Sequence, residues 1–221
     1  MHRVPKDLSW RDVLTYCQAH TTSQNELLYQ LERETHLKTM APQMMAGPYQ
    51  GQLLRFLSAM IRPRRALEIG TFTGYSALCL AEGLADDGIL HTIEVNAEVA
   101  WLAEKYLVQA DMASRIRLHI GDAFDIVPTL NETFDLVFLD AGKRQYEAMY
   151  DLVWPYLRWG GFLLVDNVLW FGKVVQGADD ADTRAIDTFN RKIVQDPRAH
   201  CLMLPVRDGL SVIQKIEKEI Q

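Results

Sequence analysis

The sequence predicts an α/β protein with a doubly wound, mostly parallel sheet and extra helices at its N-terminus. Three observations support this class. From about Arg65 onward, short apolar runs alternate with helical patterns. The first run ends in a glycine turn, Gly70 to Gly74, which opens a helix. Several later runs end in an acidic residue, so polar groups should collect along one edge of the sheet.

Length and composition limit the possible classes of protein. A chain of 221 residues that is 48% hydrophobic can bury a substantial core. We expect a single domain over 1–221, with 1–62 as a helical cap and 63–221 as the α/β core. The net charge of −6 argues against nucleic acid as a partner, because phosphate binding requires a basic surface.

Targeting features point to the cytoplasm. No apolar run approaches the ~20 residues that span a bilayer, so we expect no membrane partner. The start, Met1 to Asp7, has no apolar signal core. Three scattered cysteines form neither a disulfide framework nor a zinc cluster, and buried free thiols suit a reducing compartment. We therefore expect a cytoplasmic protein.

The first 62 residues have a helical pattern. Helices are expected from Ser9 to about Ala19, from Thr22 or Ser23 toward Leu37, and from Gly51 to Met60. The loop Met40–Pro48 between the last two contains two prolines and three methionines. Methionines can line an adaptable apolar pocket, although packing of the loop on the core explains them equally well.

The remaining elements follow the alternation. Strands are expected over 66–69, 89–95, 116–120, 134–139 and 162–165, and helices from Tyr75, from Asp122 (short), and over 97–109, 144–157 and 179–194. Gly160-Gly161 is expected to be a turn, and 167–177 a loop. Two late strands, 201–206 and 209–215, flank Asp208-Gly209, a dipeptide typical of hairpins. The hairpin suggests one antiparallel edge strand.

Four acidic residues lie at the predicted carboxyl ends of strands: Glu94, Asp122, Asp140 and Asp166. Glu94 follows Gly70 by 24 residues and can accept hydrogen bonds from the two hydroxyls of a ribose. Asp122 can accept from an adenine amino group or cap the helix that begins there. A single such residue is often only a cap, but four at equivalent places predict a ligand site.

Asp140 and Asp166 end consecutive strands. If these strands are neighbours, their backbones lie about 4.8 Å apart, and two such carboxylates repel each other unless a cation or a proton lies between them. Asn167 adds an amide oxygen. This oxygen-rich set predicts a site for Mg²⁺, or for Mn²⁺ or Ca²⁺.

Three stretches of the chain carry a family resemblance, which runs from about Gly51 to the C-terminus. Glu68-Ile69-Gly70-Thr71-Phe72-Thr73-Gly74-Tyr75-Ser76 has Phe72 where a dinucleotide fold would place a glycine. It resembles motif I of class I S-adenosylmethionine (SAM)-dependent methyltransferases, and most closely the cation-dependent catechol and caffeoyl-CoA O-methyltransferases, E-[IL]-G-x-[FY]-x-G-Y-S. Phe138–Tyr146 is similar to that group's F-[VIL]-D-x-x-K-x-x-Y, and Asp166–Val174 to its D-N-x-L-W-x-G-x-V.

The resemblance implies a Rossmann-like methyltransferase fold with seven strands, the last one antiparallel, and a homodimer. It makes Asp140, Asp166 and Asn167 the metal ligands and Lys143 the general base. The acceptor would be a small aromatic molecule with vicinal hydroxyls. We expect the SAM site to comprise Met40, Glu68, Gly70, Thr71, Phe72, Gly74, Tyr75, Ser76, Glu94, Asp122, Ala123 and Asp140.

The implied reaction is methyl transfer to one hydroxyl of a catechol. The cation favours the phenolate, Lys143 takes the proton, and the oxygen attacks the sulfonium methyl in line. To act as the base, Lys143 must be neutral, and a nearby cation should lower its pKa. Trp170, Phe171 and the methionine loop would wall the aromatic ring.

Two other functions remain open from the sequence. A nicotinamide-dependent oxidoreductase would share the sheet and the acid at a strand end, but this function would leave the Asp140–Asp166–Asn167 set unexplained. A SAM-binding module without catalysis would leave Lys143 without a role. Gly142 departs from the family pattern, where many members carry an acid or a bulky residue, so the polarity of the acceptor pocket stays open.

Overall fold

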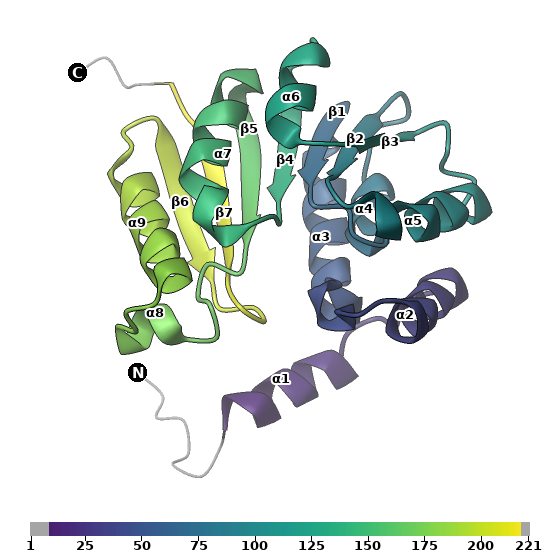
Figure 1. Cartoon of the computed structure of the whole chain (residues 1–221), viewed down its shortest axis with the longest axis horizontal. Helices are drawn as coiled ribbons and strands as arrows, with labels where there is room; N and C mark the ends of the chain where they lie inside the picture. Colours follow the sequence, from purple (N-terminus) through teal and green to yellow (C-terminus); the bar gives the residue numbers. More distant parts are fainter. Residues whose placement is uncertain (1–8, 218–221) are drawn as a thin grey trace.

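Seven strands form one sheet at the centre of the molecule (Figure 1): β1 (Arg65–Ile69), β2 (Ile89–Glu94), β3 (Ile116–Ile120), β4 (Phe134–Leu139), β5 (Leu157–Asp166), β6 (Ala199–Leu204) and β7 (Leu210–Lys215). The computed structural model describes residues 9–217. The strand order is β3-β2-β1-β4-β5-β7-β6, and the first five strands run parallel. The predicted α/β class and the seven-stranded Rossmann-like fold are confirmed.

The sequence suggested that the antiparallel strand lies at the edge of the sheet, but the structure places it inside the sheet. β7 lies between β5 and β6 and pairs antiparallel with both. The edge strand β6 therefore runs in the same direction as β5. The Asp208-Gly209 turn identified two neighbouring strands correctly, but a hairpin alone does not determine which of its strands lies outside.

Nine α-helices are present in the described residues: α1 (Trp10–Ala19), α2 (Glu26–Lys38), α3 (Gly47–Ile61), α4 (Tyr75–Ala81), α5 (Ala97–Gln109), α6 (Ala123–Ile126), α7 (Tyr146–Val153), α8 (Lys173–Gln176) and α9 (Ala181–Gln195). Short 3₁₀ helices are η1 (Pro42–Met44), η2 (Val127–Thr129), η3 (Lys143–Gln145) and η4 (Trp154–Tyr156).

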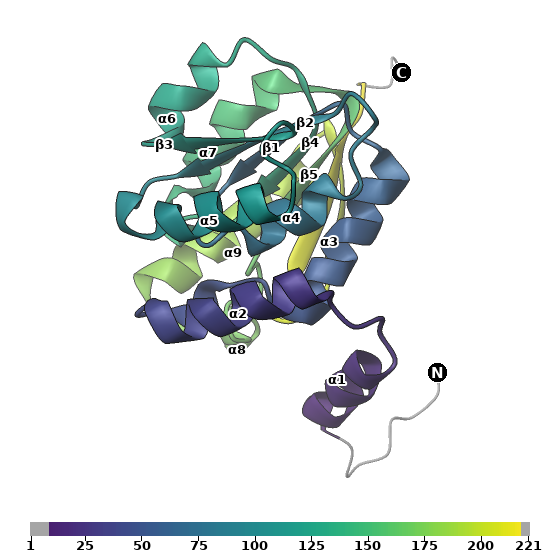
Figure 2. The same ribbon diagram turned by 90° about the vertical axis from the view of Figure 1, so that its right-hand side faces the viewer.

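The helices cover both faces of the sheet (Figures 1 and 2). On one face, α2 to α5 pack residues such as Leu54 and Tyr106 into a core shared with β1 and β4. On the other, α7 and α9 bury Tyr150 and Phe189 against the opposite side of the same strands. β4 is therefore covered on both sides, which explains its continuous apolar run.

Two helix starts differ from the prediction. Asn25, rather than Thr22 or Ser23, caps α2, because its side chain accepts a hydrogen bond from the backbone N–H of Leu28 at 2.9 Å. α3 begins at Gly47, four residues early, and takes Pro48 into its first turn, where the missing N–H of a proline costs nothing. The predicted methionine loop is correspondingly shorter and contains η1.

The predicted helix 144–157 and turn 160–161 were also wrong in detail. The helix is divided into η3, α7 and η4, and Pro155 in η4 marks its end. Gly160 and Gly161 lie inside β5, where the register with β4 shifts between Phe134 and Leu136. The glycine pair therefore accommodates a strand irregularity, which local sequence does not distinguish from a turn. α8 forms within the predicted loop 167–177.

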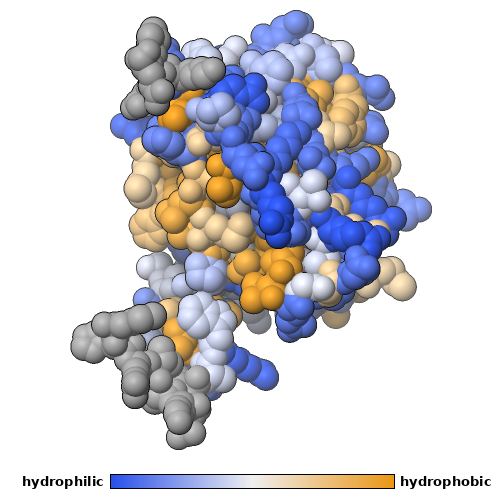
Figure 3. Space-filling model, turned by 90° about the vertical axis from the view of Figure 1, so that its left-hand side faces the viewer, coloured by the Kyte–Doolittle hydropathy of each residue, from blue (hydrophilic) through white to orange (hydrophobic). Residues whose placement is uncertain are grey.

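The ends of the molecule differ in their packing. α1 projects from the body (Figure 2) and has no buried residue, although Ser9 and Asp12 form a capping box at its start. β6 is an edge strand of the sheet and exposes Leu202 and Met203. The surface seen from that side has apolar groups beside a hydrophilic band (Figure 3).

Three further expectations concern membrane spans, a signal core and the cysteines. Among residues 9–217, no helix combines the length and apolar character that crossing a bilayer requires. The stretch Met1 to Asp7, predicted to lack a signal core, lies outside the described residues. The three cysteines are free, but only Cys79 is buried, whereas Cys17 and Cys201 are half-buried.

Candidate active site

A cavity of about 570 Å³ lies at the carboxyl ends of the parallel strands. Its walls come from the turn after β1, the ends of β2, β4 and β5, and the tip of the β6–β7 hairpin. Ligands of open α/β sheets bind at this edge, where the strand order reverses. Here the reversal falls between β1 and β4, directly beside the glycine turn.

The glycine turn has an unusual backbone. Gly70, Phe72 and Gly74 all have positive φ values, of 106°, 49° and 89°. A Cβ on Gly70 would lie 1.9 Å from the backbone oxygen of Asp140. The close approach of the turn to the end of β4 therefore requires a glycine at this position.

The backbone of Ile93 and the side chain of Glu94, both in β2, hold the turn. The N–H groups of Gly70 and Thr71 donate to the oxygen of Ile93 at 3.0 and 3.2 Å. Glu94 accepts from the N–H of Phe72 at 2.6 Å through one carboxylate oxygen and from the N–H of Asn96 at 2.8 Å through the other. Glu94 lines the cavity as predicted, and it also fastens the turn to β2.

Glu68 lies behind the turn and is fully buried. Its Oε2 accepts from the hydroxyl of Thr92 at 2.5 Å, and the Oγ1 of Thr92 and of Thr71 are also 2.5 Å apart. Its Oε1 has no partner, and burial raises the pKa of Glu68 to about 8. The Glu68 side chain is therefore largely neutral around pH 7.

Lys143 lies at the centre of a polar cluster. Its Nζ donates to Asp140 Oδ1 at 3.0 Å, to Asn167 Oδ1 at 2.6 Å and to the hydroxyl of Tyr146 at 2.7 Å. Tyr146 is fully buried and donates its own hydroxyl to the backbone oxygen of Asp166 at 2.8 Å. Three acceptors around one ammonium fit the protonated form of Lys143.

Asp140 and Asp166 are brought together by pairing of β4 with β5, in which Leu139 lies opposite Val165. Asp166 is only 3% exposed, and its Oδ1 accepts from the N–H of Asn167 at 2.8 Å. Burial, and then the charge of Asp140, raise the pKa of Asp166 above its ordinary value. Two carboxylates lie beside the single ammonium of Lys143, so Lys143 can offset the charge of only one of them.

The donor atoms of this cluster suit a divalent cation by their chemistry. Two carboxylates and the amide oxygen of Asn167 are hard oxygen ligands, which Mg²⁺ and Ca²⁺ prefer. Histidine, cysteine and acidic side chains do not converge in groups of three or more anywhere within residues 9–217. A cation at this place would share its ligands with Lys143, whose ammonium bonds two of the three.

Most predicted site residues line the cavity, namely Gly70, Thr71, Phe72, Tyr75, Ser76, Glu94, Asp122, Ala123, Asp140, Lys143, Asp166 and Asn167. Met40 does not, because its side chain is fully exposed; Gln43, Met44 and Met45 of the same loop line the cavity instead. Glu68 and Gly74 also lie outside the lining. Asp122 caps α6 by accepting from the N–H of Phe124 at 2.8 Å, so the capping alternative holds alongside its place in the cavity.

The tip of the β6–β7 hairpin was not predicted to reach the site. Arg207 donates to the backbone oxygen of Met45 at 3.2 Å and to Gln50 Oε1 at 2.8 Å, which ties the hairpin to the N-terminal helices. Asp208 accepts from the N–H of Phe171, and its second oxygen has no partner. Arg207-Asp208-Gly209 has the pattern of a turn, and nothing local indicates that the turn faces a cavity.

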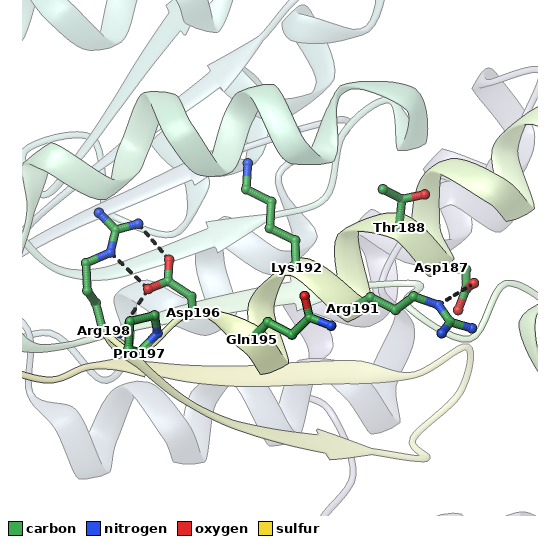
Figure 4. A pocket seen from close by; sticks show the side chains of 8 residues that line it. All are labelled: Asp187, Thr188, Arg191, Lys192, Gln195, Asp196, Pro197 and Arg198. Carbon is green, nitrogen blue, oxygen red and sulfur yellow. Dashed lines mark hydrogen bonds and ion pairs between the residues drawn. The ribbon is translucent and has the colours of Figure 1, made fainter.

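A second concavity, of about 620 Å³, lies between α9 and the start of β6 (Figure 4). Its charged groups are paired with one another or with α7. Arg191 contacts Asp187 at 2.9 Å, Arg198 contacts Asp196 at 2.6 Å, and Lys192 reaches Asp151 at 2.8 Å. It lies away from the carboxyl ends of β1, β2 and β4, so the first cavity is the stronger candidate despite its smaller volume.

A family model described as "O-methyltransferase" matches residues 18–216. Among curated proteins, the chain is 38% identical over 173 residues to catechol O-methyltransferase domain-containing protein 1 of Mus musculus. That match covers 76% of this chain and 66% of the mouse protein, so the chain spans just under two thirds of that relative. It is also 30% identical over 225 residues to a caffeoyl-CoA O-methyltransferase of Eucalyptus gunnii, covering 89% and 90% of the two chains.

The fold is found in solved structures. The O-methyltransferase TomG of Streptomyces achromogenes, involved in tomaymycin synthesis and crystallised in complex with SAM, superposes with a TM-score of 0.84 at 30% sequence identity. The superposition covers 94% of this chain and 97% of TomG. The likeness therefore extends over nearly the whole chain.

Proposed function

The chain belongs to the O-methyltransferase family, and from that premise we propose that it transfers a methyl group from SAM to one hydroxyl of a catechol-type small molecule with the help of a divalent cation. One observation carries the proposal. The glycine turn, the acid at the end of β2, and the cluster of Asp140, Lys143, Asp166 and Asn167 line a single cavity.

The donor side of the cavity fits SAM by its chemistry. Glu94 is 8% exposed at the end of β2, where a carboxylate can accept from ribose hydroxyls. Asp122 and Ala123 lie at the end of β3, where an adenine could meet them. Glu68, expected near the amino-acid end of SAM, is buried behind the glycine turn and bonded to Thr92, so it supports the turn from outside the cavity lining. SAM supplies a methyl group activated by its sulfonium.

The cation would be held by Asp140, Asp166 and Asn167. When bound, such an ion lowers the pKa of a hydroxyl that it contacts. The chain's own residues do the rest. Pairing of β4 with β5 holds the two carboxylates together before any ligand arrives, and Asn167 is oriented by its bond to Lys143.

Lys143 is the proposed proton acceptor. It lies 14% exposed at the cavity wall, within hydrogen-bond distance of Asp140, Asn167 and Tyr146. It can accept the proton of an acceptor hydroxyl only after losing its own. Tyr146 fixes the position of Nζ, because its hydroxyl is held in turn by the backbone of Asp166.

The acceptor end is walled by Met44, Met45, Trp170 and Phe171, an apolar and aromatic set that suits a flat ring. The names of the relatives, catechol and caffeoyl-CoA O-methyltransferases, agree with a vicinal diphenol. A homodimer in the cytoplasm remains our expectation, and light scattering of the purified protein would test the dimer.

The decisive experiment is turnover of SAM over a panel of vicinal diphenols, including a caffeoyl thioester, with and without EDTA. We expect activity on at least one diphenol, abolished by EDTA and restored by Mg²⁺. Activity that persists in EDTA would remove the cation from the mechanism. Calorimetric titration with SAM and with NAD separates the alternatives: NAD binding without SAM binding would support an oxidoreductase, and SAM binding without turnover a non-catalytic module.

A further inference from the structure

α2 and the loop after it pass over the glycine turn. We define residues 24–46, from just before α2 to the residue before α3, as the N-terminal strap. Leu28 and Leu31 bury one side of α2 in the core. Its end supplies Met44 and Met45 to the lining of the cavity. The strap is therefore both packed on the body and part of the candidate site.

Two hydrogen bonds join the strap to the glycine turn. The Oγ1 of Thr35 donates to the Oγ1 of Thr73 at 2.9 Å, between side chains that are 0% and 1% exposed. The hydroxyl of Tyr75 donates to Gln24 Oε1 at 2.6 Å. Thr73 and Tyr75 both line the cavity, whereas Thr35 and Gln24 do not. Thr35 and Gln24 thus act on the glycine turn from outside the cavity lining.

The turn needs such support because Phe72, directly before Thr73, has a positive φ of 49°, which is unfavourable for a residue with a side chain. Conformations of this kind persist only where the surroundings hold them. Bonds from β2 hold the first half of the turn at Gly70, Thr71 and Phe72. The strap holds the second half, at Thr73 and Tyr75.

We propose that Thr35 is a positioning residue for the methyl donor, which holds the glycine turn in its binding shape through the hydroxyl of Thr73. The inference rests on the proposed function, because it concerns the affinity for SAM. Since coupling between two sites is reciprocal, binding of SAM should also stabilise α2 on the body.

The test is Thr35→Val, which keeps the shape of the side chain and removes its hydroxyl. We expect SAM to bind about 3- to 10-fold more weakly in calorimetry, as the loss of one buried hydrogen bond predicts. The KM for SAM should rise by a similar factor while kcat at saturating SAM stays within about twofold. Thr35→Ser, which retains the hydroxyl, should restore the affinity.

Ser58→Ala is the matched control. Ser58 is fully buried in α3 and donates to the backbone oxygen of Leu80 at 2.6 Å, outside the cavity lining. The Ser58→Ala variant should lower the melting temperature much as Thr35→Val does, but leave the affinity for SAM unchanged. Hydrogen exchange gives a second readout: SAM should slow amide exchange over 26–38 in the wild type, and less in Thr35→Val.

The inference is overturned if Thr35→Val binds SAM as tightly as the wild type, or if Ser58→Ala weakens SAM binding equally. Should Thr35→Val fail to fold, Gln24→Ala removes the second bond and is measured in the same way, with unchanged SAM affinity counting against the inference. If the wild-type protein itself does not bind SAM, the proposed function is wrong, which distinguishes that failure from failure of the strap.

Discussion

Replacing Gly70 by alanine tests the contact between the glycine turn and the end of β4. The added Cβ would lie 1.9 Å from the backbone oxygen of Asp140, and the φ of 106° disfavours any residue with a side chain. Two costs add: about 1–3 kcal/mol for the strained backbone and about 1–3 kcal/mol for forcing the packed neighbour aside. We expect the free energy of unfolding to fall by about 4 kcal/mol in Gly70→Ala.

Gly177→Ala separates the two costs. Gly177 also has a positive φ, of 68°, but a Cβ there meets nothing within 4 Å. It should lose only the conformational share, about 1–2 kcal/mol. The difference between the two variants, roughly 2–3 kcal/mol, therefore measures the clash with Asp140.

The assay is urea denaturation at 25 °C, followed by fluorescence and by circular dichroism so that coincident transitions support a two-state analysis. Because the clash displaces Asp140, turnover of Gly70→Ala should fall as well, while Gly177→Ala keeps wild-type turnover. Equal losses of stability in the two variants would refute the reasoning, since the close approach of the turn to β4 would then carry no cost.

Three other predictions concern different parts of the molecule. Lys143→Met should lower kcat by about 10²- to 10⁴-fold with SAM binding retained, and unchanged turnover in the presence of metal would exclude Lys143 as the base. Burial, and then the charge of His119, lower the pKa of His91 to about 4. His91 therefore takes up a proton more readily in the unfolded chain than in the folded one. Its contribution of roughly 3 kcal/mol to the free energy of unfolding should be present above pH 6.5 and be lost as the pH falls from 6.5 to 4. In urea melts over that pH range, the free energy of unfolding of His91→Asn should depend less on pH than that of the wild type. An unaltered dependence would contradict the assignment. Lys215→Met should lower the free energy of unfolding by about 1–3 kcal/mol, because the Nζ of Lys215 bonds two backbone carbonyls at 2.7 Å each. Its turnover should stay at the wild-type level, since Lys215 lies at the opposite end of β7 from the cavity, and a loss of activity without a loss of stability would argue against a purely structural role.

The sequence by itself determined the elements and the edge of the sheet where the site lies. Apolar runs such as 134–139 define strands through local burial, and the observed β4 has the same bounds. Carboxyl ends of parallel strands meet at one edge, so Glu94, Asp140 and Asp166 could be expected to converge before any contact was known. Elements with mixed local patterns were less predictable: the glycine pair 160–161 is equally compatible with a turn and with the strand irregularity that the structure contains.

Only the tertiary structure decided the contacts between segments distant in the chain. The place of β7 inside the sheet, the approach of Arg207 and Asp208 to the cavity, and the bond from Thr35 to Thr73 all depend on long-range packing. The same holds for Met40, which points to solvent because the chain turns after α2 and presents Met44 and Met45 to the cavity instead. Periodicity and motif spacing describe neighbours along the chain. The partners of a side chain across a fold are determined by how whole helices and strands pack.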